Sequence, residues 1–186
     1  MTNQIIWSFI ESKEGFNNKA YVPLDNQGNV AGNSGITIGS GVDLGAIGEE
    51  GLQKLNLSDD LFQKLNKYTP YKKDDAVEFL SRNPLTLYKN ECIELQEAVE
   101  SQAADTLEAE FNNDSDTLFA NLTPTQQTII MSVAFQYGNL SQRTPKFWKY
   151  ATEGCWPCVV NVLRNFGDAY GTRRNSEADI LENSLK

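Results

Sequence analysis

The chain has 186 residues, of which 40% are hydrophobic and 22% charged, a balance typical of one globular domain with a substantial core. Sixteen Lys and Arg against twenty-five Asp and Glu give a formal charge of −9, which argues against nucleic-acid binding and against general adhesion to anionic membranes. The sequence contains no histidine, which excludes Ser-His-Asp and Cys-His nucleophiles and histidine-bound zinc. Proton transfer near neutral pH is then left to carboxyl, tyrosine, lysine or thiol groups.

The first segment, residues 3–14, is predicted to be an amphipathic helix that ends at Gly15. Trp7, Ile10 and Glu14 lie on one stripe of this helix. No basic region precedes its apolar residues, and charged residues interrupt them too early for a signal peptide. We therefore expect a soluble protein made in the cytoplasm, without membrane insertion, so a target outside the cytoplasm requires delivery by a pore, a secretion system or a fused module.

Residues 19–43 alternate glycine-containing turn motifs with short apolar segments. Tyr21 lies in one strand candidate, and Ile36–Ile38 alternates as a strand does. These signals predict a small antiparallel hairpin of two or three strands. Gly39 suits a backbone that turns sharply or approaches a ligand closely.

Helical periodicity dominates after Gly48. A long helix is predicted over about 85–111, and the four glutamates of its outer face are interpreted as solvated: Glu91, Glu94, Glu97 and Glu100. Thr123, Pro124 and Gln126 form a strong start for a helix that runs to Gly138. Shorter helices are expected near 49–56, 58–67, 73–82, 145–152, 156–166 and 175–184.

These elements predict one α+β domain that is predominantly helical. Its N-terminal lobe, about 15–84, carries the small sheet. The long helix of about 85–111 joins this lobe to a helical lobe of residues 112–186, which packs with helix 3–14.

Three cysteines are present, two of them in the motif Cys155-Trp156-Pro157-Cys158. The spacing is that of a thiol redox pair, but no βαβ pattern surrounds it. We interpret the pair as buried thiols or a disulfide, with a thiol oxidoreductase as a minor alternative function. Two cysteines are too few for structural zinc, so neither a metal nor an organic cofactor is expected.

Two carboxyls and a hydroxyl carry the candidate chemistry. Glu14 continues an apolar stripe, and desolvation would raise its pKa as a general acid needs. Asp43 follows a glycine-rich turn, where backbone N–H groups would keep it ionised, and Thr37 could hold a water between the two carboxyls. Glu11, off the stripe, and Asp25, in a turn, are the weaker alternatives.

The order of these motifs resembles the phage T4-type lysozymes, and more closely their pesticin-like branch. The shared motifs are the helix ending in Glu14-Gly15, the hairpin with Thr-Ile-Gly, the Leu-Thr-Pro-x-Gln-Gln helix ending Phe-Gln-Tyr-Gly, and a late Gly-x-Arg-Arg-x-x-Glu. T4-type enzymes place an aspartate after eight intervening residues, where this chain has Pro23. The pesticin-like order is Glu, Thr, Asp with twenty-two and five intervening residues, which Glu14, Thr37 and Asp43 match.

The resemblance implies a lysozyme-like fold with Glu14, Thr37 and Asp43 as catalytic residues. It also implies that one of two arginines pairs with Glu14. The candidate substrate-binding residues are Tyr21, Gly39, Gln136, Tyr137, Arg173 and Arg174.

The implied activity is a peptidoglycan muramidase that hydrolyses the β-1,4 bond between N-acetylmuramic acid and N-acetylglucosamine. The alternatives are a lytic transglycosylase on the same glycan and a lysozyme-like module that only binds cell wall or protein. The resemblance allows an endolysin, a bacteriocin domain or a secretion-system effector that acts in the periplasm. Its expected partners are peptidoglycan glycan strands and, for a toxin, a cognate immunity protein or delivery module; we expect a monomer.

Overall fold

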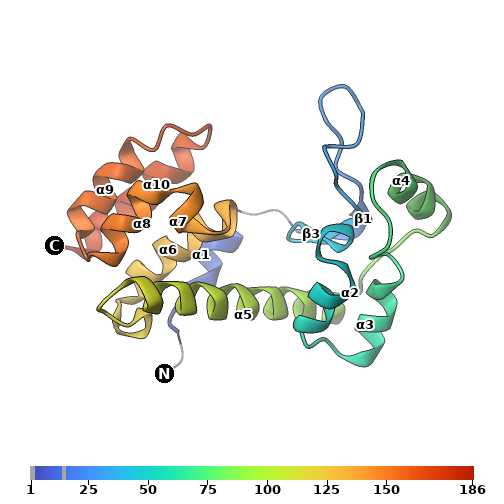
Figure 1. The fold of residues 1–186 in the computed structure, drawn as a ribbon, viewed down its shortest axis with the longest axis horizontal. Coiled ribbons are helices and arrows are strands. Elements are labelled where there is room, and N and C mark those ends of the chain that lie inside the picture. Colours follow the sequence, from blue (N-terminus) through green and yellow to red (C-terminus); the bar gives the residue numbers. More distant parts are fainter. Residues whose placement is uncertain (1–2, 14–15) are drawn as a thin grey trace. The chain divides into compact units, whose positions relative to one another are not determined.

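The computed structural model describes residues 3–13 and 16–186 (Figure 1). It confirms the predicted α+β class, with ten α-helices and one three-stranded antiparallel sheet among the described residues. The chain forms two compact units. The sheet unit is Glu14–Gln102, and the helical unit combines Met1–Lys13 with Ala103–Lys186.

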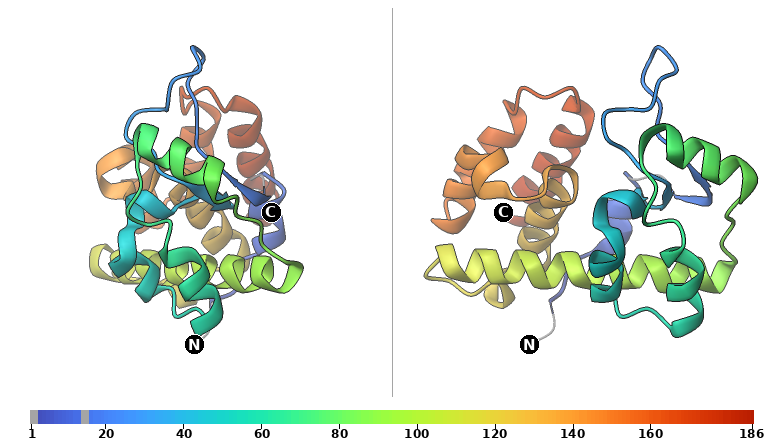
Figure 2. Two further views of the ribbon diagram at one scale, coloured as in Figure 1. Left: turned by 90° about the vertical axis from the view of Figure 1, so that its right-hand side faces the viewer. Right: turned by 45° about the vertical axis from the view of Figure 1, so that its right-hand side comes forward.

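The sheet of the first unit has the order β1-β2-β3. The strands are β1 (Asn17–Tyr21), β2 (Thr37–Gly39) and β3 (Val42–Asp43). The chain between β1 and β2 extends away from the sheet, as Figure 2 shows. Leu85 continues the sheet beyond β1, because its carbonyl accepts a hydrogen bond from the N–H of Ala20 (2.9 Å).

Helices α2 (Leu44–Lys54), α3 (Asp59–Asn66) and α4 (Lys73–Arg82) complete the sheet unit with the first part of α5 (Lys89–Asp114). Helix α2 begins five residues before the predicted 49–56, because Asp43 caps it and Gly48 bends it at φ 65°. The sequence pattern identified only the part after this bend. Apolar side chains of the sheet and these helices form one core, including Ile36, Ile38, Leu44, Leu52, Leu61, Leu65 and Leu95.

The glutamates of α5 are not a solvated face, so that interpretation is wrong. Glu91 forms an ion pair with Lys64 of α3 (Oε2 to Nζ, 2.7 Å). Glu94 accepts hydrogen bonds from the N–H and hydroxyl of Ser58. Glu100 is buried and accepts a hydrogen bond from the side chain of Gln96, and of these four glutamates only Glu97 is exposed.

The helical unit is built around α6, whose central turn from Ile129 to Val133 is fully buried. The predicted start is confirmed: the Thr123 hydroxyl accepts from the N–H of Gln126, and the Gln126 side chain accepts from the N–H of Thr123. The unit contains α1 (Trp7–Glu11), α6 (Pro124–Tyr137), α7 (Leu140–Arg143), α8 (Pro145–Thr152), α9 (Trp156–Arg164), α10 (Gly171–Ser184), the last part of α5 and the 3₁₀ turn Phe119–Asn121.

Helix α1 is shorter than the predicted helix over 3–14. The N–H of Gln4 donates to the side chain of Gln127 (2.6 Å), and the N–H of Ile6 donates to the hydroxyl of Thr128 (2.9 Å). Side chains of α6 therefore satisfy these donors while the segment before Trp7 stays non-helical. In the part of the chain that the structure describes, no helix has the length and apolarity needed to cross a membrane.

Candidate active site

Thr37 and Asp43 lie directly opposite each other across the antiparallel strands β2 and β3. Opposed residues of an antiparallel pair send their side chains to the same face of the sheet. On the other side of β2, Tyr21 of β1 is the partner of Thr37. Tyr21, Thr37 and Asp43 therefore form one row across the sheet. Thr37 is buried, Asp43 half-buried and Tyr21 exposed.

The Asp43 carboxylate is held by two backbone N–H groups. The N–H of Ala46 donates to Oδ1 at 2.9 Å, which makes Asp43 the N-cap of α2. The N–H of Gly35 is shared between Oδ1 (3.1 Å) and Oδ2 (3.0 Å). Because a carboxylate offers about four lone-pair sites, Oδ2 keeps the capacity to accept a proton from a water.

Gly35 connects the two side chains through its backbone. Its N–H binds Asp43, and its carbonyl accepts a hydrogen bond from the Thr37 hydroxyl at 3.4 Å. A Cβ at this position would lie 2.7 Å from Asp43 Oδ1 and 2.7 Å from the Cα of Gly45. Only glycine fits where these chain segments cross, so the requirement for Gly35 is close approach.

We expect Gly35→Ala to lower the free energy of unfolding by about 1–3 kcal/mol, because the added methyl overpacks a buried crossing of backbone. The same methyl should displace the Asp43 carboxylate from its present hydrogen bonds. Urea unfolding tests the first effect, and a crystal structure of the variant tests the second. The matched control is Gly171→Ala at the start of α10, where a Cβ meets nothing within 4 Å and stability should be unchanged or slightly higher. Equal stability of the two variants would contradict the close-approach argument.

Gly39 is buried with φ +68°, and a Cβ there would lie 3.2 Å from Leu95 Cδ2, so packing and backbone conformation explain it. A direct contact of Gly39 with substrate stays a prediction. Glu14, the predicted general acid, lies outside the described residues.

Arg174, a candidate glycan contact, is 1% exposed in the helical unit. Its Nη2 donates to the side-chain oxygen of Gln136 (2.7 Å) and lies 3.0 Å from Glu177 Oε1. Its Nε lies 3.7 Å from Asp168 Oδ2. Burial is the main reason that the pKa of Arg174 falls below its usual value, with Glu177 opposing the shift. A guanidinium enclosed in this way has little surface for contact with a sugar. Its hydrogen bond also takes up the side-chain oxygen of Gln136.

Arg173 is the less buried of the two arginines, with 11% of its side chain exposed. Its Nε donates to Glu177 Oε1 at 3.2 Å. Its Nη2 donates to the carbonyl of Ser132 at 2.9 Å and to the Ser132 hydroxyl at 3.2 Å. Ser132 of α6 and Glu177 of α10 therefore both hold the guanidinium of Arg173.

Tyr137, the last residue of α6, shares Asp168 with Arg174 and so belongs to the same group of polar side chains. Its hydroxyl donates to Asp168 Oδ2 at 2.6 Å, and its ring packs against Phe166 with centroids 5.6 Å apart. Burial, then the hydrogen bond to Asp168, raises the pKa of Tyr137 to about 12. The phenol is therefore a neutral donor at any physiological pH, and its role as a glycan contact stays a prediction.

The sequence analysis missed Ser132, Asp168 and Glu177 as members of this cluster. One available signal was Ser132, which interrupts the apolar run of α6. Another was the spacing of Glu177, four residues after Arg173 and three after Arg174, which puts all three on one helix face. The sequence does not show the contacts of this charged group with Ser132 and Gln136, because α6 and α10 meet only in the folded chain.

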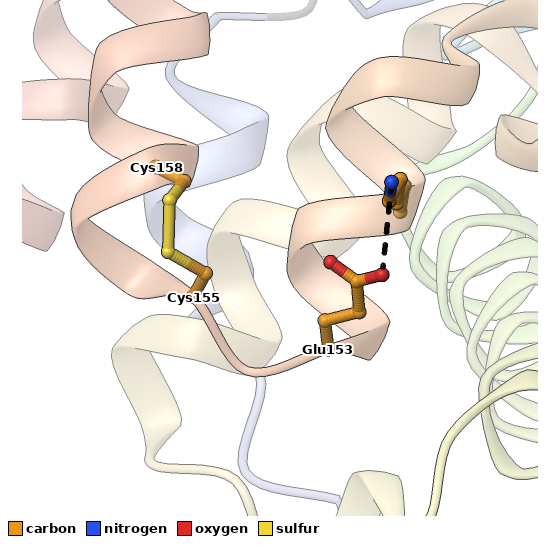
Figure 3. The surroundings of a disulfide bond; sticks show 4 residues. Glu153, Cys155 and Cys158 are labelled. Carbon is orange, nitrogen blue, oxygen red and sulfur yellow. Dashed lines mark ion pairs between the residues drawn. A yellow bond between two sulfur atoms is a disulfide. The ribbon is translucent and has the colours of Figure 1, made fainter.

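Cys155 and Cys158 form a disulfide at the N-terminus of α9, as Figure 3 shows. This matches one of the two interpretations of the motif, and Cys92 remains a free thiol. Among residues 3–13 and 16–186, no group of three or more Cys, Asp or Glu side chains is arranged to hold a metal ion.

The helical α+β fold, with its small sheet, is that of a lysozyme-like protein. A family model described as "Pesticin: Bacterial toxin homologue of phage lysozyme, C-term" matches residues 4–157. This match covers most of the chain, so the protein belongs to the pesticin family of phage-lysozyme homologues. A search of curated proteins gives no match. The matched range includes Glu14, Thr37 and Asp43, and it ends before Arg173 and Arg174.

Proposed function

We propose that this protein is a peptidoglycan muramidase that hydrolyses the β-1,4 bond between N-acetylmuramic acid and N-acetylglucosamine. Its membership in a family of toxin homologues of phage lysozyme supports a glycan-cleaving role. The proposal rests mainly on the positions of Thr37 and Asp43. These residues lie opposite each other across β2 and β3, and both side chains bind the backbone of Gly35. This pair supplies a hydroxyl and a carboxylate to one face of the sheet.

In the proposed reaction, the Glu14 carboxyl donates its proton to the glycosidic oxygen as the bond from that oxygen to the anomeric carbon breaks. A water attacks the anomeric carbon from the opposite face and gives its proton to Asp43. Thr37 orients this water by a hydrogen bond. Direct attack by water requires no covalent intermediate and favours inversion of configuration at the anomeric carbon.

Residues other than Glu14, Thr37 and Asp43 are also proposed to contact the glycan. Tyr21 extends the row of Thr37 and Asp43 with an exposed ring, which suits stacking against a sugar. Gln136, Tyr137 and Arg173 are proposed as further glycan contacts, whereas Arg174 is enclosed in the helical unit.

Product analysis tests the reaction class. The purified protein is incubated with bacterial sacculi, and soluble fragments are separated and identified by mass spectrometry and by a reducing-end assay. We expect fragments with new reducing ends. Anhydro-muramic ends without reducing groups would instead assign the protein to the lytic transglycosylases. Binding to sacculi without any product would leave a non-catalytic module and overturn the proposal.

We also propose that the protein acts as an antibacterial toxin or effector domain in the periplasm of a target cell. The family description as a bacterial toxin homologue supports this. The charge of −9 disfavours passive adsorption to an acidic cell wall, so delivery would bring the enzyme to its substrate. A toxin with this activity requires a cognate immunity protein in the producing cell, and co-purification with the product of a neighbouring gene tests for one.

A further inference from the structure

The disulfide between Cys155 and Cys158 has no part in the proposed hydrolysis. Both cysteines are half-buried, so each keeps some surface in contact with solvent, and Gly154 and Pro157 beside them are exposed. The bond encloses only two residues, and both cysteines belong to the start of α9, as Figure 3 shows. It therefore joins no two separate elements of the fold, and a thiol in solution can reach it.

Stability gives a weak reason for a disulfide at this position. A disulfide stabilises a fold mainly by restricting the unfolded chain, and the effect grows with the length of chain that the bond encloses. The enclosed segment here is very short. Helix α9 is held by its core side chains instead, since Val159 and Leu163 are buried and the helix packs against α8 and α10.

The first turn of α9 has an unused capping position. Cys155 is the N-cap residue, and its side chain makes no capping hydrogen bond. An N-cap side chain accepts from the N–H of the second or third helical residue. The second is Pro157, which has no N–H, so the donor is Cys158. A thiolate released at Cys155 would accept from this donor at the positive end of the helix, which stabilises the open form of the bond.

We propose that Cys155 and Cys158 form a thiol–disulfide exchange site, which takes two electrons from thiols of another molecule. A partner thiolate attacks Cys158 Sγ, the S–S bond breaks, and its electron pair leaves on Cys155 Sγ. A second partner thiolate then attacks the partner sulfur of this mixed disulfide, and the electron pair leaves on Cys158 Sγ. Two partner thiols become one disulfide, and the two cysteines take up through solvent the two protons that the partner thiols release.

The rate at which excess glutathione opens the disulfide at pH 7 tests the proposal. The reference is a peptide of residues 153–161 with the same disulfide, which is too short to form a stable helix. Alkylation of free thiols at timed intervals and mass spectrometry measure the opened fraction. We expect the full chain to open about twofold to thirtyfold faster than the peptide, the factor equivalent to one helix cap. A rate equal to or below that of the peptide would identify a protected structural bond and overturn the proposal.

The capping argument has its own test in Cys158→Ser, which leaves Cys155 as a free thiol at the start of α9. Cys92 is the internal reference, because it is also half-buried and burial raises the pKa of its thiol. Cys155 should react with iodoacetamide at pH 7 about tenfold faster than Cys92, as expected of a thiol at a helix N-terminus. Mass spectrometry of the two peptides gives both rates from one sample. If Cys155 reacts no faster than Cys92, the helix does not stabilise its thiolate and the proposal fails.

A dithiol peptide in place of glutathione distinguishes the sources of the partner thiol. Faster exchange with the peptide at equal thiol concentration assigns a protein dithiol as the partner, and faster exchange with glutathione assigns a thiol of low mass. The site is independent of the proposed function: Cys155→Ser should leave reducing-end release from sacculi unchanged, and Glu14→Gln should leave the exchange rate unchanged. A natural protein that releases no reducing ends would end the muramidase proposal alone.

Discussion

Replacement of Glu14 by Gln is expected to abolish glycan hydrolysis and leave the fold intact. The amide has the size of the carboxyl group but has no acidic proton to give to the leaving oxygen. Loss of a positioned general acid costs about 10²–10⁴ in rate. Reducing-end release from sacculi measures the loss, and circular dichroism with thermal unfolding confirms the fold.

The neighbouring acid provides the control for this experiment. Glu11 is exposed at the end of α1, so Glu11→Gln should retain full activity. A Glu14→Gln variant as active as the natural protein would remove Glu14 from the mechanism. Loss of activity in Glu11→Gln alone would transfer the acid role to Glu11.

Replacement of Asp43 by Asn is expected to stop hydrolysis while stability stays nearly constant. Asn and Asp are comparable N-cap residues, so the amide oxygen can keep the hydrogen bond from the N–H of Ala46. The amide cannot take a proton from the attacking water. Activity assays and urea unfolding of the same preparation should therefore give opposite results, with a large loss in the first and little change in the second.

Asp43→Ala is the matched comparison for the structural role of the side chain. It removes both the cap of α2 and the acceptor for the N–H of Gly35, and the free energy of unfolding should fall by about 0.5–2 kcal/mol. Full activity of Asp43→Asn together with anhydro products would favour a transglycosylase, which needs no carboxylate to activate water.

The local sequence predicts those elements whose boundaries depend on short-range interactions. Helix α6 begins at Pro124 because Thr123 and Gln126 form a capping box within four residues. Helices α4 and α8 match their predicted ranges, 73–82 and 145–152. The predicted hairpin is present, although β1 begins at Asn17, where the sequence has no apolar alternation to mark it.

Elements fixed by distant residues escaped the sequence analysis. The segment before Trp7 is not helical because Gln127 and Thr128, far along the chain, take its N–H groups. The short helix α7 has only four residues and no periodicity to detect. Glu91 and Glu94 of α5 were misread because their partners, Lys64 and Ser58, lie on α3 and at its N-cap.

The sequence by itself determined the residue types and spacing of the candidate site: no histidine, Glu14, Thr37 and Asp43 in the pesticin order, and glycines around them. The tertiary structure alone decided how these groups are held. Gly35 links Thr37 to Asp43 through the fold of one hairpin, and Glu177 of α10 is joined to Ser132 of α6, 45 residues away in the chain. The physical reason is that chemical identity and local spacing are written along the chain, whereas burial and hydrogen-bond partners arise only when separate segments pack together.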